Sequence, residues 1–173
     1  MSLGRSGTRD NPQPNGHDNI RLRERILIMV AELRRFDDAL GKKIEKLMQD
    51  GHANAAAIRA LPESGDALSN SWKTVFEQHD AVYHEMQTGF ETRFRPEAML
   101  LVEEARCQLG DVEPPRPSPT SYGHPDPEVK RQLEISRGYS YIQYGFRSEG
   151  SIANPSQLRY IADYLETSAD RLK

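Results

Sequence analysis

The sequence has little of the material that several protein classes need. Of its 173 residues, one is cysteine, one is tryptophan, and 36% are hydrophobic. A single Cys107 cannot form an intramolecular disulfide or a cysteine cage for a metal, which disfavours a disulfide-stapled secreted domain and predicts a reducing, cytoplasmic location. The apolar fraction lies below the roughly 45–50% of an ordinary globular protein, so we expect only part of the chain to form a packed core.

Long apolar runs are absent as well, and the net charge is small. The best candidate for a secretory signal, residues 26–31, is short and is closed by Glu32. It also falls far below the roughly 18 consecutive apolar residues of a membrane-spanning helix. A formal net charge of -3 gives no overall electrostatic reason to bind nucleic acid or an anionic membrane. These features predict a soluble protein with no membrane span.

Two stretches show a heptad pattern of apolar residues without Gly or Pro across residues 18–40 and 66–88. Alternating steps of four and three residues are typical of helices that pair along one seam. The first stretch predicts a helix from Asp18 to near Gly51, and the second predicts a helix over 66–88. The two seams consist of Leu22, Ile26, Met29, Leu33, Phe36 and Leu40, and of Leu68, Trp72, Val75, His79, Val82 and Met86.

The connection over 51–65, with a short helical piece at 54–61, allows the two helices to fold back as an antiparallel hairpin. The same seams could equally pair between chains. Further apolar residues flank the seams and widen them, which favours a bundle of three or four helices over an isolated rod. A third helix is predicted from Pro96 to Leu109. The flanking residues are Val30, Ile44, Phe76, Tyr83 and Phe90.

The composition changes after the third helix, where six prolines fall between residues 114 and 127. We predict a flexible N-terminal arm over 1–17, a helical bundle over 18–110, a Pro-rich linker over 111–127 and a C-terminal helical element over 128–173. Asp126 and Pro127 are expected to open a short helix to about Arg137, and Asn154 with Pro155 a terminal helix to Lys173. The aromatic segment over 139–146 fits neither helix nor strand. The predicted fold is all-α, a bundle on two long antiparallel heptad helices with a small C-terminal helical element.

The sequence offers little support for metal binding or catalysis. His79, Asp80 and His84 are the best metal-ligand cluster, but His79 lies in the apolar seam while His84 lies on the opposite side of the same helix. The sequence has no Gly-rich phosphate loop, no Gly-x-Ser-x-Gly elbow and no His-Glu-x-x-His. We therefore expect that the protein binds no metal or cofactor and is not an enzyme.

The sequence predicts a protein–protein interaction or assembly module that pairs helices with another protein or with itself. The alternative is a nucleic-acid-binding module that uses the basic residues of the first helix, although acidic residues alternate with them. The predicted interface residues are Leu22, Ile26, Met29, Leu33, Phe36, Trp72, Val75, Met86, Tyr139, Tyr141, Tyr144 and Phe146. The alternative would use Arg21, Arg25, Arg34, Arg35 and Lys42.

Overall fold

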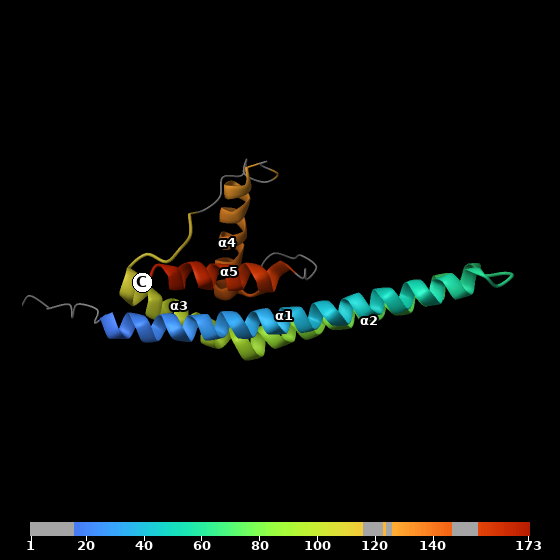
Figure 1. The fold of residues 1–173 in the computed structure, drawn as a ribbon, viewed down its shortest axis with the longest axis horizontal. Helices are drawn as coiled ribbons and strands as arrows, with labels where there is room; N and C mark the ends of the chain where they lie inside the picture. The colour runs from blue at the N-terminus through green and yellow to red at the C-terminus, as the bar shows by residue number, and fades with distance from the viewer. Residues whose placement is uncertain (1–15, 116–122, 124–125, 147–155) are drawn as a thin grey trace, which may run out of the picture.

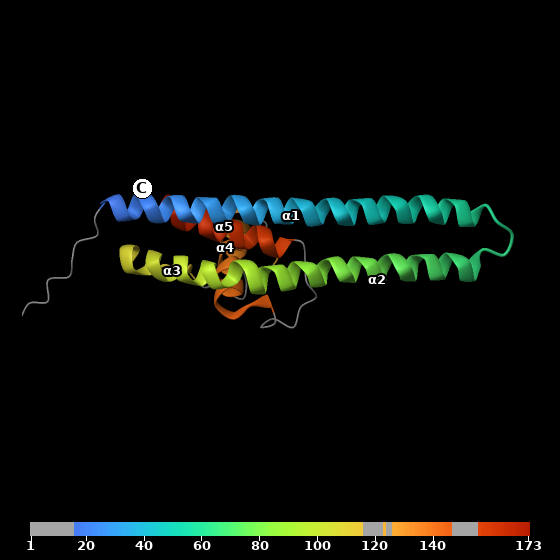
Figure 2. The ribbon, with the colours of Figure 1, turned by 90° about the horizontal axis from the view of Figure 1, so that it is seen from below.

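Helices account for all the regular structure in the described part of the chain, which confirms the predicted all-α class. The computed structural model describes residues 16–115, 123, 126–146 and 156–173. Two long helical rods run antiparallel, and two shorter helices pack over one end of them (Figures 1 and 2). The predicted N-terminal arm up to Asn15, most of the Pro-rich linker, and the proposed start of the terminal helix at Asn154 and Pro155 lie outside the described residues.

The first rod is α1, Gly16–Arg59, which continues beyond the end that the sequence predicts. The prediction that the helix ends near Gly51 is wrong, as is the separate helical piece at 54–61. Gly51 is buried, and a Cβ atom there would lie 3.0 Å from Cγ2 of Val75 and 3.3 Å from Cζ3 of Trp72. The missing side chain therefore lets the second rod approach closely, and this close packing compensates for the weak helix propensity of glycine.

The second rod contains three consecutive elements, α2 (Gly65–Gly89), η1 (Phe90–Phe94) and α3 (Arg95–Leu109). The expected helix starting at Pro96 is thus a continuation of the second rod rather than a separate helix. Pro96 has no backbone N–H to donate to the carbonyl four residues earlier. Directly before it, η1 is a π turn in which the Arg95 N–H donates to the carbonyl of Phe90, five residues back. The wider turn keeps the chain helical up to the proline.

Helices α4 (Pro127–Tyr144) and α5 (Ser156–Asp170) pack on each other, and α5 lies along α1. The Asp126 carboxylate accepts a 2.9 Å hydrogen bond from the Glu128 amide, which confirms the predicted start of α4. The helix does not end near Arg137. It continues through the aromatic segment to Tyr144 and ends at Gly145, whose φ of 75° favours glycine.

The hydrophobic core lies where α5 and α4 cover the rods. Leu33, Leu101, Ile142 and Ile161 are all fully buried there, so the N-terminal half of α1 and the C-terminal helices share one core. Beyond this region the rods extend alone, as Figures 1 and 2 show. We call the part formed by residues 44–80 the projecting hairpin. Its buried residues are Gly51, Ala55 and Val75.

Candidate functional site

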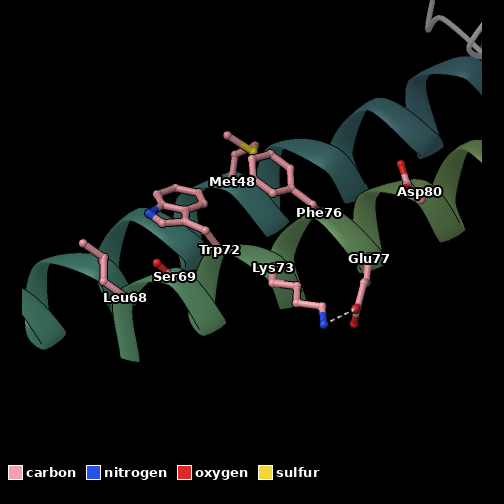
Figure 3. Close-up of a pocket in the computed structure, with 8 residues that line it drawn as sticks. All are labelled: Met48, Leu68, Ser69, Trp72, Lys73, Phe76, Glu77 and Asp80. Carbon is pink, nitrogen blue, oxygen red and sulfur yellow. Dashed lines mark ion pairs between the residues drawn. The ribbon is translucent and has the colours of Figure 1, made fainter. Parts of the chain in front are cut away.

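The projecting hairpin carries an open apolar groove along one side, between α1 and α2 (Figure 3). Met48 contributes from α1, and Leu68, Trp72 and Phe76 contribute from α2. The groove has a volume of about 900 Å³, and the Phe76 side chain at its centre is 60% exposed. We call these four residues the apolar groove. Met48, Leu68 and Trp72 are half-buried, and a cluster of large apolar side chains that stays at least partly accessible is a feature of surfaces that bind other molecules.

The position of the groove follows from helical spacing. Leu68, Trp72 and Phe76 are four residues apart and so form one row on α2. Val75 lies on the side of the same helix that faces α1, and it is buried against Gly51. Two helices can bury only the faces they turn toward each other, so the neighbouring row remains in solvent. The Trp72 and His52 rings also contact each other in a T-shaped arrangement, with the ring centroids 5.1 Å apart.

Charged side chains border the groove on its α2 side. Figure 3 shows Lys73 and Glu77 pointing away from α1, with Asp80 one turn further along the helix. Lys73 Nζ lies 4.0 Å from Glu77 Oε1, at the outer limit of an ion pair, and the two side chains are 76% and 67% exposed. Such a pair is well hydrated and contributes little to stability. The border therefore has one basic and two acidic groups available to a partner.

Most of the predicted seam residues are buried within the folded molecule. Leu22, Ile26, Met29, Leu33 and Met86 belong to the core where the C-terminal helices cover the rods. The two heptad seams thus pair within one chain, one of the two arrangements that the sequence left open. Phe36 is half-buried, with its ring 5.5 Å from that of Phe94, and Val75 is buried. Among the predicted interface residues, Trp72 is the one that also lines the apolar groove, and Leu68 of the second seam lines it as well.

The aromatic segment is mainly a packing element. Tyr139, Tyr141 and Phe146 are buried, whereas the Tyr144 side chain is 69% exposed. The Phe146 ring lies 4.7 Å from that of Phe90 in η1, and the Tyr139 ring 5.3 Å from that of Tyr164 in α5. These contacts dock the end of α4 on the rest of the molecule and leave only Tyr144 accessible.

A polar cluster holds this docked end in place. The Arg95 guanidinium donates 3.0 Å hydrogen bonds from Nε to the Ile142 carbonyl and from Nη2 to the Gln143 carbonyl. These carbonyls are among the last four of α4, which no amide of the same helix can reach. Glu91 accepts from Arg95 at 3.2 Å and from the Phe146 amide at 3.3 Å. Both charges are occupied by structural contacts, so this cluster is not a candidate reaction centre.

The basic residues of α1 do not form a continuous free surface. Arg25 pairs with Glu104 at 2.6 Å, and Arg34 pairs with Glu166 at 2.5 Å. The hydrogen bond from Glu166 raises the pKa of Arg34 above its ordinary value. Arg21, Arg35 and Lys42 are exposed along the same helix. Because carboxylates of α3 and α5 already neutralise two of the five basic groups, the arrangement does not favour a phosphate backbone.

The His79, Asp80 and His84 side chains face different surroundings. The ring of His79 packs edge-on against Tyr83 with the centroids 4.6 Å apart, and Asp80 borders the apolar groove. His84 lines a separate small hollow beside Glu91 and Phe146. Across the described ranges, no three His, Cys, Asp or Glu side chains converge as metal ligands would.

The sequence pointed to the groove only indirectly. Phe76 widens the seam in the sequence pattern, and this extra width predicts contact with further helices of the bundle. That prediction holds for Phe90, which meets Phe146, whereas no helix of the described chain covers Phe76. Met48 and Leu68 belong to the apolar helix patterns, which carry no signal that these two residues line a groove.

Comparison with known proteins returned no family model, no curated protein and no solved structure that matches this chain. None of the described helices has the length and apolar character needed to cross a bilayer.

Proposed function

We propose that this chain is a non-enzymatic protein–protein interaction module that acts through helix pairing, with the projecting hairpin as its docking element. The observation that carries the proposal is the apolar groove, where Phe76 is 60% exposed and Trp72 is half-buried on a hairpin that α4 and α5 leave uncovered. Burying such side chains against a partner helix releases their hydration water and supplies the driving force for binding.

The shape of the molecule supports this assignment. The base, where α4 and α5 cover the rods, buries its own apolar residues, whereas the projecting hairpin leaves Met48, Leu68, Trp72 and Phe76 at least partly exposed. Aromatic side chains at the centre of an interface commonly contribute most of the binding free energy. The docking residues in this proposal thus differ from the predicted interface residues and share only Trp72 with them.

The charge of the projecting hairpin favours a protein over a nucleic acid as the partner. Residues 44–80 contain three basic and six acidic side chains. A surface that binds phosphates needs an excess of Lys and Arg, because neutralising phosphates and releasing their counterions drives such binding. We also propose a cytoplasmic location, which the single Cys107 supports because reducing compartments keep thiols free.

Site-specific photo-crosslinking in intact cells tests the proposal. A photoreactive benzoylphenylalanine replaces Phe76 in one protein and Ile28 in a second, because both side chains are 60% exposed and Ile28 lies in the base. We expect discrete protein adducts from position 76, none from position 28, and loss of the adducts when Trp72→Glu is added to the position 76 protein. Equal labelling from both positions, or adducts that survive Trp72→Glu, would contradict the proposal.

A further inference from the structure

The apolar groove has a direction along α2. Leu68 lies nearest the tip of the projecting hairpin, Trp72 and Phe76 follow, and Asp80 lies toward the base. At 1.5 Å per residue this row is about 18 Å long. The next row outward is charged, and in it the basic Lys73 lies on the tip side of the acidic Glu77.

This order of side chains is self-complementary. When two copies meet about a two-fold axis, a residue on the tip side of the axis faces a residue at the same distance on the base side. An axis crossing α2 near residues 74–75 brings Trp72 of one copy against Phe76 of the other. The row of Lys73 and Glu77 is centred one residue further along, about 1.5 Å away, a shift that these long side chains span, so Lys73 of one copy also meets Glu77 of the other and each contact occurs twice.

The charged groups are free to make this exchange. Lys73 and Glu77 are 4.0 Å apart within the chain and largely hydrated. Turning them toward a second copy therefore costs little, because an exposed intrahelical pair is worth only a fraction of a kcal/mol. Once the apolar side chains between the copies exclude water, opposite charges at the edge of the contact fix its register and orientation.

We infer that a second copy of this chain docks antiparallel on the apolar groove, so that two projecting hairpins form a four-helix arrangement. The inference rests on the proposed function and names its partner. Packing two hairpins in this way buries the apolar row that each leaves in solvent, which is the usual solution for helices with wide apolar faces.

Light scattering coupled to size-exclusion chromatography of the full chain is the first test. We expect a dimer at about 50 µM and dissociation on dilution, as a small interface predicts. Phe76→Glu should weaken the dimer at least about thirtyfold, since it places a charge at the centre of the contact. Ile28→Glu is the matched control, since Ile28 is equally exposed at 60% and lies in the base, and it should leave the dimer intact.

A charge exchange tests the antiparallel register. Lys73→Glu alone leaves two acids facing two acids, and Glu77→Lys alone leaves two bases facing two bases, so each homodimer should weaken about tenfold. An equimolar mixture of the two variants should form heterodimers, which native mass spectrometry resolves. Zero-length cross-linking of mixed isotopically light and heavy wild-type protein should yield a mixed-isotope peptide joining Lys73 to Glu77.

Circular dichroism melts keep these tests independent of folding, since Phe76, Lys73 and Glu77 are all exposed and their variants should retain the wild-type melting curve. A wild-type chain that stays monomeric to about 1 mM overturns the inference, and so does a dimer that survives Phe76→Glu. A monomer that still gives Trp72-dependent photo-adducts to other proteins in cells overturns only the inference and leaves the proposed function standing. A monomer that gives no Trp72-dependent adduct at all overturns both.

Discussion

Tyr164 shows how one buried side chain couples the fold to pH. Its ring lies in the core beside Tyr139, and its hydroxyl donates a 3.0 Å hydrogen bond to the Val112 carbonyl. Burial raises the pKa of this phenol to about 12, an effect that a hydrogen bond with Ser168 partly offsets. The neutral form is therefore the one that the folded state accommodates.

Alkaline unfolding should report on this residue. Because the folded-state pKa exceeds the unfolded value of about 10, the contribution of Tyr164 is fully present below pH 10 and is lost as pH rises toward about 12. Urea unfolding at pH 8 and at about pH 11.5 should show a loss of roughly 2 kcal/mol that is absent in Tyr164→Phe. Tyr144→Phe, at a site 69% exposed, is the control. Equal alkaline losses in the wild type and in Tyr164→Phe would contradict the assignment.

At the scale of elements, close crossings depend on glycine. Gly138 lies where α4 crosses α5, and a Cβ atom there would overlap the carbonyl oxygen of Tyr160. The obstruction is backbone, which cannot rotate aside as a flexible side chain does. Gly41 offers the opposite case, because it lies within α1 with nothing within 4 Å of its would-be Cβ.

The two glycines make a matched pair of substitutions. Gly138→Ala should destabilise the fold by about 2–3 kcal/mol by forcing α4 and α5 apart. Gly41→Ala should stabilise it by about 0.5–1 kcal/mol, because alanine forms exposed helix more readily. Thermal melts of both variants against the wild type measure the difference. Equal effects at the two sites would mean that α4 and α5 have room for a Cβ atom where they cross.

Local pattern predicted the two long helices, since heptad spacing depends only on neighbours along the chain. The local pattern failed at Gly51, because a glycine is typical of a helix end and the sequence does not show the close approach of Val75. It also left residues 139–146 open, since the contacts that place the end of α4 and the following Phe146 are with Tyr164 and Phe90, far away in sequence. Which apolar face stays in solvent depends in turn on where α5 lies along α1. The sequence could therefore supply Trp72 and Phe76 as apolar residues, but it could not identify the groove.

At the scale of the molecule, the number of packed layers changes along the rods. The base has the support of α4 and α5, whereas the projecting hairpin consists of two helices joined at residues 60–64. Helices this thinly supported open more readily, because few buried contacts oppose local unfolding.

Hydrogen exchange should map this difference. In dilute protein, peptides within 45–58 and 66–78 should exchange at least about tenfold faster than peptides within 22–34 and 98–106. Mass spectrometry of quenched, digested samples measures both sets in one experiment. Uniform exchange along α1 would mean that the projecting hairpin is as stable as the base.

The π turn also has a consequence for chain length. The first rod contains 44 residues, and the second, from Gly65 to Leu109, spans α2 with 25, η1 with 5 and α3 with 15. A π turn takes up one residue more than an α turn without lengthening the helix by a full step. It therefore accommodates an additional residue within the second rod, so that the chain stays helical without a break from Gly65 to Leu109.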